Sequence, residues 1–267
     1  MRFLTGLAGV RRKTARKAPI KVAFGSRFKS AAKNAVRSSL LHVTKFLGLF
    51  DLSRMLTRNG LRILCYHGGS MLDEHRFSPG TFMTEATFQR CMDFFLCQKY
   101  PVLDLTEAMT RLDDGTLPDY ATVITIDDGW LGTYEKLVSI LRRRRFPSTL
   151  YVTTYYAVKK TAVFEMFVPY LLWRSIDKSI DLARVTDGLE GSFDLSDSEA
   201  RDAAASRILA YGNAKLDAAG RQDLANRISD VLGCDTAEMT SAGLFRLVDD
   251  QQISELAEKR IDIQLHT

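Results

Sequence analysis

The sequence predicts an α/β protein built on a parallel sheet or a (β/α) barrel, and three observations support this. Strand-like and helix-like segments alternate between residues 61 and 155, as they do in parallel α/β folds. A long, mostly helical stretch then interrupts this alternation, and another strand-like segment follows at residues 261–265. We therefore expect a basic arm and amphipathic helix at residues 1–60 and one α/β domain at 61–267, with a helical insertion at about 160–245.

Composition places the chain among ordinary globular proteins. Of its 267 residues, 46% are hydrophobic and 26% are charged, which excludes collagen, low-complexity fibres and disorder throughout. No stretch approaches the roughly 18 consecutive apolar residues of a membrane span, and the opening MRFLTGLAGVRRK has too short an apolar run for a secretory signal. The four cysteines form no CxxC pair. We expect reduced thiols in a cytoplasmic protein.

The basic charge is concentrated at the N-terminus. Residues 1–50 contain twelve Lys and Arg and no acidic residue, so the remainder has a net charge of −7. We therefore expect a flexible basic arm at 1–30, and we expect no nucleic-acid partner, since the body lacks an excess of cations.

A helix is predicted after the arm. Its apolar residues recur every three or four positions and form one stripe: Ala32, Val36, Leu40, Val43, Leu47 and Phe50. Two alternatives remain open. The helix packs on the body, or it is a basic amphipathic helix that rests on an anionic membrane surface and makes the protein peripheral there.

The elements of the first half follow from short-range patterns. Residues 122–126 (TVITI) are apolar and β-branched along their whole length, as in a strand buried on both faces. A tight turn through His67-Gly68-Gly69 is expected after the first strand. The expected strands are residues 63–66, 102–105, 122–126 and 148–153, and the expected helices are residues 87–99, a short one opened by Thr106, and 134–145.

The second half contains mostly helices. A gap of 107 residues separates Thr153 from Ile261, whereas one barrel repeat needs about 30 residues. We infer a helical insertion of about 80 residues, which could form a lid. The expected helices are residues 164–176, 197–210 with Ser196 as N-cap, 217–232 and 251–260.

Two polar clusters follow predicted strands. Asp127, Asp128 and Gly129 come directly after residues 122–126, and His266 follows residues 261–265. Adjacent carboxylates repel, and a bound metal cation offsets that repulsion. The alternative is an ordinary turn with solvated aspartates. The Asp-Asp-Gly sequence, taken alone, favours this alternative. Both clusters, however, fall at the C-terminal ends of strands, where barrel enzymes place their chemistry.

Four stretches in register resemble the polysaccharide deacetylases, the carbohydrate esterase family 4 group that includes nodulation-type chitooligosaccharide deacetylases. TIDDG stands where that family usually has Thr-Phe-Asp-Asp-Gly. The segment before His266 is similar to the one that leads into the family's His-Ser/Thr-x-x-His motif. The four stretches are LCYHGGS (64–70), TFMTEATFQRCMDFFLCQKYPVLDLTEAM (81–109), ATVITIDDGWLGTYEKLVSILRRRRFPSTLYVTT (121–154) and FRLVDDQQISELAEKRIDIQLHT (245–267).

The resemblance implies a distorted (β/α) barrel and a metal-dependent hydrolase. Asp127 would be the catalytic base, and Asp128 and His266 would bind a divalent metal, usually zinc. His67 could support the metal site by contacting its ligands without binding the metal itself. The substrate would be an acetylated amino-sugar glycan, and the products would be acetate and a free amine. A structural role at a strand end is an equally good reading of His67.

Departures from the family pattern shape a further expectation. Ile126 replaces the usual Phe, and the family's second metal histidine would come four residues after His266, beyond Thr267. The family's later groove motif and general-acid histidine have no counterpart. We therefore expect an incomplete barrel that binds metal weakly, has low solubility and releases no measurable acetate by itself. A non-catalytic binding or scaffold module, and an adaptor that works through the basic arm, remain alternatives.

Overall fold

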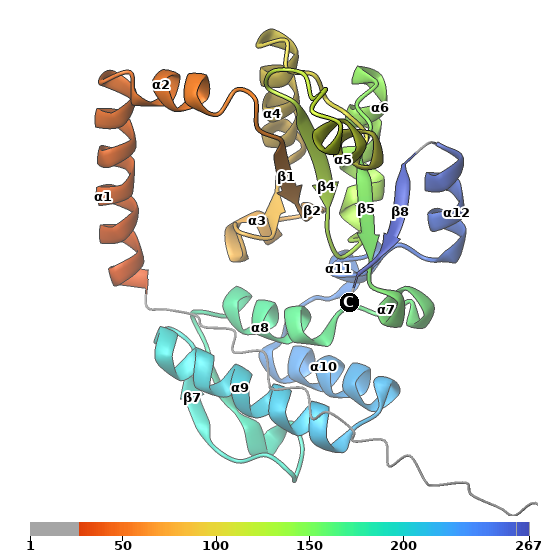
Figure 1. Ribbon diagram of the computed structural model, residues 1–267. Coiled ribbons are helices and arrows are strands. Elements are labelled where there is room, and N and C mark those ends of the chain that lie inside the picture. Colours follow the sequence, from red (N-terminus) through yellow and green to blue (C-terminus); the bar gives the residue numbers. More distant parts are fainter. Residues whose placement is uncertain (1–26, 260, 267) are drawn as a thin grey trace, which may run out of the picture.

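A computed structural model describes residues 27–259 and 261–266 of the chain. The arm expected at 1–30 therefore lies mostly outside the described residues, and its last four residues belong to a helix. Figure 1 shows three parts: a pair of N-terminal helices, a central sheet with its covering helices, and a second, mainly helical cluster below the sheet. Among the described helices, none combines the length and the apolar character needed to cross a bilayer.

The central sheet has four parallel strands, which confirms the predicted α/β class with a parallel sheet. Its order is β1-β4-β5-β8, so the last strand of the chain pairs beside β5. Within the described residues the sheet is open, with β1 and β8 at its edges. Closure into a barrel stays a prediction. The strands are β1 (Arg62–Tyr66), β4 (Thr122–Ile126), β5 (Thr149–Val152) and β8 (Asp262–Leu265).

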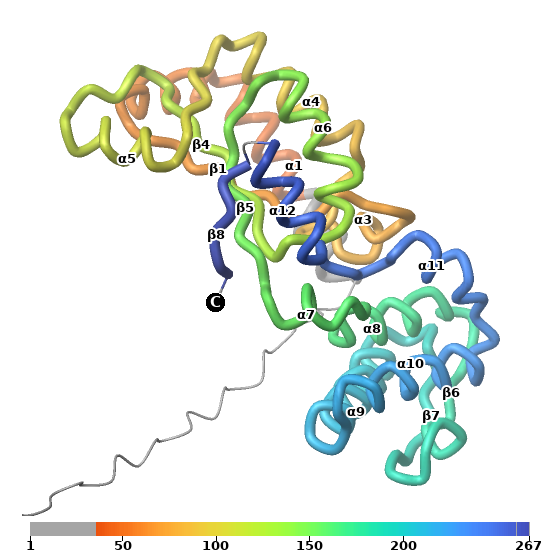
Figure 2. The backbone as a smooth tube through the Cα atoms, turned by 90° about the vertical axis from the view of Figure 1, so that its right-hand side faces the viewer, coloured from red at the N-terminus to blue at the C-terminus, as the bar shows by residue number. Residues whose placement is uncertain are grey.

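An apolar core covers one face of the central sheet. All five residues of β4 are buried, in agreement with the β-branched run that predicted a strand buried on both faces. Ile124 and Ile126 pack with side chains of three covering helices. In Figure 2, α12 lies beside α6 and β8. The helices are α4 (Glu85–Cys97), α6 (Val138–Arg144) and α12 (Asp250–Glu258).

A second core lies in the stretch where the sequence predicts an insertion. Its buried residues come chiefly from α8 (Phe164–Arg174), α9 (Ser198–Lys215) and α10 (Ala218–Leu232). A short antiparallel pair, β6 (Ser179–Asp181) and β7 (Ser192–Asp194), packs on the same helices. The helices expected here are therefore present, and the hairpin between α8 and α9 was not expected.

The N-terminal helices differ from the expectation of one continuous helix. Helix α1 (Arg27–Phe46) ends before Gly48, and α2 (Leu49–Leu56) begins after it. Gly48 has a φ of 67°, which a glycine adopts without strain, so the chain turns there. Val36 and Leu40 on the apolar stripe are exposed. The alternative that this helix packs on the body is therefore wrong for the described residues.

The structure corrects the strand expected at 102–105, because strand pairing there is minimal and a helix N-cap follows. The strand expected at 102–105 is reduced to one bridge between Val102 and Thr122. Helix α5 (Leu105–Asp113) begins there because the Asp104 side chain accepts hydrogen bonds from the backbone N–H of Thr106 and Glu107, as an N-cap does.

The beginnings of two further helices also differ from the sequence-based expectation. Asp197, not Ser196, is the N-cap of α9. The helix expected at 134–145 begins with a π-helical turn, η1 (Thr133–Leu137), before α6. The short elements that sequence patterns did not predict are β2 (Gly68–Gly69), α3 (Glu74–Phe77), β3 (Phe82–Met83), α7 (Thr154–Lys159), η2 (Leu182–Arg184) and α11 (Ala237–Ser241).

Candidate active site

The predicted site residues meet at one edge of the sheet because the strands are parallel and in register. Tyr66 pairs with Ile126, so His67 and Asp127 follow two neighbouring strands at the same level. On the other side of β5, the backbone N–H of His266 donates to the carbonyl of Val152 at 3.0 Å. The carboxyl ends of β1, β4 and β8 therefore bring together residues that lie far apart in the sequence.

A sharp turn after β4 separates the two adjacent carboxylates. Asp128 and Gly129 have φ values of 70° and 78°, and the N–H of Gly129 donates to the carbonyl of Asp127 at 2.9 Å. Aspartate tolerates this left-handed conformation better than most residues. At Gly129 a Cβ would lie 3.3 Å from a methyl carbon of Val152, a slightly tight contact, so it is chiefly the positive φ that favours glycine here.

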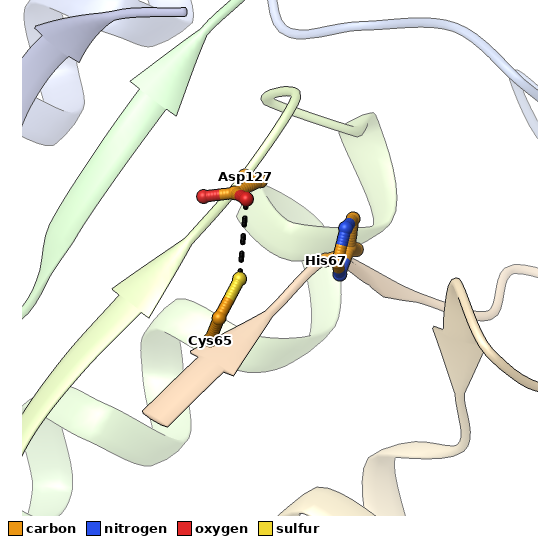
Figure 3. A group of neighbouring side chains, drawn as sticks. All are labelled: Cys65, His67 and Asp127. Carbon is orange, nitrogen blue, oxygen red and sulfur yellow. Dashed lines mark hydrogen bonds between the residues drawn. The ribbon is translucent and has the colours of Figure 1, made fainter. Parts of the chain in front are cut away.

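Asp127 faces the end of β1 (Figure 3). The thiol of Cys65 donates a hydrogen bond of 3.1 Å to its Oδ2. One potential ligand atom from each of Cys65, His67 and Asp127 lies within 4.8 Å of the other two. Asp127 and His67 are half-buried, and Cys65 is exposed. The backbone carbonyl of His67 also accepts a hydrogen bond of 2.9 Å from Thr133 Oγ1, which holds this turn against η1.

Asp128 faces the other way, toward the end of β8. Its Oδ2 accepts a hydrogen bond of 2.8 Å from the indole N–H of Trp130. Its Oδ1 lies 3.8 Å from Nε2 of His266. About a third of each of these two side chains is exposed to solvent. Trp130 is buried against Phe82 and Phe245, so the indole that orients Asp128 is held firmly.

An open pocket of about 320 Å³ borders these groups. It is lined by Asp127, Tyr151, Leu265 and His266. The pocket thus reaches one carboxylate and the histidine from the solvent side. Tyr151 contributes an aromatic ring beside them.

Although Cys65 is exposed as a residue, the partial burial of its thiol and the neighbouring carboxylate raise the pKa of that thiol. Partial burial, followed by the hydrogen bond and the negative charge of Asp127, raises the pKa of Cys65 to about 11. At neutral pH Cys65 is therefore a neutral donor to Asp127. A thiolate at this position requires a cation nearby.

The donor set at this edge fits a divalent metal of the zinc type. Zinc binds cysteine sulfur, histidine nitrogen and carboxylate oxygen. Within the described part of the chain, the group of three potential ligands is Cys65, His67 and Asp127. The pair predicted from the sequence, Asp128 and His266, lies beside that group. The structure thus gathers all four predicted residues at one edge, in two sets.

Three site residues were not expected from the sequence: Cys65, Tyr151 and Trp130. Cys65 lies on β1 two positions before His67, which directly follows that strand. Residues two apart in an extended chain lie on the same face, and that spacing is a signal that could have found Cys65. Tyr151 carried no signal, because its place depends on how β5 pairs with its neighbours.

Comparisons with known proteins find similar chains among the solved structures. No protein-family model matches the chain, and no curated protein matches it. A solved structure of IcaB from Ammonifex degensii has 26% sequence identity and a TM-score of 0.31, and the match covers 35% of this chain and 38% of that one. A de-N-acetylase from Aggregatibacter actinomycetemcomitans has 13% identity and a TM-score of 0.31, with 77% of this chain and 94% of that one covered. The chain thus spans well under half the length of IcaB.

Proposed function

We propose that this protein is a metal-dependent hydrolase that removes N-acetyl groups from an acetylated amino-sugar glycan. The observation that carries the proposal is the divergence of two adjacent carboxylates at the end of the central strand β4. Asp127 faces Cys65 and His67, and Asp128 faces Trp130 and His266. One carboxylate is thereby available to bind a metal while the other handles a proton. The TIDDG motif and its flanking stretches favour deacetylation over other hydrolyses.

Asp128 and His266 would hold the metal. A carboxylate oxygen and an imidazole nitrogen 3.8 Å apart are close enough to bind one zinc ion together. Trp130 supports Asp128 through its indole N–H, as hydrogen bonds to ligating carboxylates do at metal sites. A divalent ion bound here would polarise an amide carbonyl and lower the pKa of water.

Asp127 would act as the base. Its carboxylate lines the open pocket and can take a proton from the water that attacks the acetamide carbonyl carbon. Asp127 would then return this proton to the sugar nitrogen as the C–N bond breaks. The acetic acid formed would lose its remaining proton to the amine, so the products are acetate and the protonated amine of the sugar. Cys65 would position this carboxylate through its hydrogen bond at 3.1 Å. His67, at the end of β1, would lie beside the same carboxylate.

The glycan would occupy the pocket beside Tyr151. The pocket opens to solvent and is bordered by Asp127 and His266, so a polymer or oligomer can present one acetamide without threading through the protein. The ring of Tyr151 offers an apolar surface for a sugar ring.

Metal binding tests the ligand assignment. Cobalt(II) and zinc binding are measured on the wild-type chain and on single variants, with cobalt absorption reporting the ligand types. We expect Asp128→Asn and His266→Ala to lose binding, and Asp127→Asn and Cys65→Ser to retain it. A thiolate-to-cobalt band that disappears in Cys65→Ser, together with loss of binding in His67→Ala, would move the metal to Cys65, His67 and Asp127 and would overturn the roles given above.

Acetate release tests the reaction itself. N-acetylated chitooligosaccharides are incubated with the longest product of the gene that contains these residues, with zinc or with a chelator. We expect release that the chelator abolishes and added zinc restores. A zinc-loaded protein that releases no acetate would instead favour the non-catalytic binding module.

A further inference from the structure

The two N-terminal helices expose many apolar side chains. Helix α1 stands apart from the sheet in Figure 1 and packs against α2, with which it forms an L. Val36, Leu40 and Val43 share one face of α1 and are 54–69% exposed. Side chains of this kind are normally buried by a neighbouring element, and the described part of the chain provides none that covers them.

Helix α2 turns its polar side to the body and its leucines away from it. The guanidinium of Arg54 lies 5.5 Å from the centre of the Tyr100 ring and donates a hydrogen bond of 2.9 Å to Gln98. At 100° per residue, Leu52 and Leu56 lie roughly opposite Arg54, and they are 47% and 74% exposed. The contacts of Arg54 therefore leave the leucine face of α2 directed toward solvent.

The distribution of charge along the chain indicates the kind of partner that fits this surface. Helix α1 contains five basic and no acidic residues, and residues 1–50 contain twelve basic and no acidic residues. The rest of the chain has a net charge of −7. An anionic surface would therefore attract this end of the protein and repel the body, which orients the molecule with α1 and α2 toward that surface.

We propose that the α1–α2 surface, defined by Val36, Leu40, Val43, Leu49, Leu52 and Leu56, docks onto an anionic lipid bilayer. Apolar side chains with basic residues on the same short helix are the pattern of helices that lie in the membrane interface. Neither helix is long and apolar enough to span the bilayer, so the pair lies in the headgroup region.

Vesicle flotation with two matched double variants tests the proposal. Leu40→Glu with Val43→Glu places two acidic residues on the apolar face of α1. Ser38→Glu with His42→Glu places the same two charges on the opposite side of the same helix. All four side chains are exposed, so both variants should keep the wild-type circular dichroism spectrum. The full 267-residue chain is floated with vesicles of phosphatidylcholine alone and with added phosphatidylglycerol.

We expect the wild type to bind the anionic vesicles and to dissociate as salt is raised. Both variants should lose affinity through their added negative charge, and the apolar-face variant should bind at least roughly tenfold more weakly than its control, because it also loses buried apolar area. Equal binding to neutral and anionic vesicles, or equal loss in the two variants, would overturn the proposal. Vesicle-independent self-association that only the apolar-face variant abolishes would assign the surface to a second copy of the chain.

Discussion

The thiol of Cys65 donates a hydrogen bond to Oδ2 of Asp127 across two paired strands, at 3.1 Å. This contact joins β1 to the turn after β4 and fixes the direction of one of two adjacent carboxylates. The other, Asp128, is fixed by Trp130 and faces His266. The proposed division of labour between a base and a metal ligand therefore depends on donors outside the Asp-Asp-Gly turn, and each donor can be changed separately.

Removing the base should lower turnover strongly without removing the metal. In Asp127→Asn, made in the longest gene product used for the acetate assay, the side chain keeps its shape but cannot take a proton, so acetate release should fall by about 10²–10⁴-fold. Zinc content should stay near that of the wild type, because Asp128 provides the ligand. Acetate assays and elemental analysis on the same preparation check both statements. If the variant kept most of its activity, Asp127 would not be the base.

Removing the donor to Asp128 should weaken metal binding more than it weakens the fold. Trp130→Phe keeps an aromatic ring between Phe82 and Phe245 but deletes the N–H that holds Asp128. Loss of such a supporting hydrogen bond typically lowers metal affinity by about 10–100-fold.

The control for this variant is Trp173→Phe, which makes the same change in a tryptophan that packs against Phe77 and Tyr170 in the helical cluster. Zinc affinity, measured by competition with a chromophoric chelator, should be unchanged in the control. Equal losses of affinity in the two variants would show that the effect comes from general loosening of the core.

The pKa of Cys65 predicts its reactivity. Because burial and Asp127 raise the pKa of Cys65 from 9.0 to about 11, the thiolate fraction at pH 8 should be about 100-fold lower than in an unshifted cysteine. Alkylation of Cys65 in the metal-free protein should therefore be slow at pH 8 and should accelerate as pH rises toward 11.

Asp127→Asn isolates the part of this shift that comes from the carboxylate. Without the negative charge the pKa of Cys65 should fall, and alkylation at pH 8 should accelerate by up to about tenfold, since burial still contributes. Cys97, which is also exposed, is the internal reference when the labelled peptides are quantified by mass spectrometry. An unchanged rate at Cys65 would mean that the hydrogen bond does not persist in solution.

The backbones of Gly69 and Gly132 approach so closely that no side chain should fit at position 132. A Cβ on Gly132 would lie 1.8 Å from the carbonyl oxygen of Gly69, so Gly132→Ala must push β2 away from the start of η1 and move the turn that carries His67. We expect a loss of about 2–4 kcal/mol of unfolding free energy in urea titrations. Gly80→Ala, where a Cβ meets nothing within 4 Å, is the control and should change stability by less than about 1 kcal/mol. Similar stability of the two variants would argue against this contact.

Local sequence determined the elements whose stabilising interactions are short-range. The run TVITI at residues 122–126 became β4 with the predicted bounds, because β-branched residues fit a strand buried on both faces. The helices near 87–99, 164–176 and 217–232 formed within a few residues of their predicted ends, because apolar spacing and capping are read from neighbouring positions. The order of polar residues after strands likewise placed Asp127, Asp128 and His266 at strand ends.

Tertiary structure decided what depends on partners far away in the sequence. The pairing of β8 with β5 brings His266 to Asp128, and the pairing of β1 with β4 brings Cys65 to Asp127. The chain makes a left-handed turn at Asp128 and Gly129, and the two carboxylates accept from different donors, Cys65 for Asp127 and Trp130 for Asp128. The exposure of the α1 stripe was equally undecided, because an amphipathic pattern states which side of a helix is apolar and not what covers it. Side-chain direction and burial arise from the packing of whole elements, so only the folded chain could settle them.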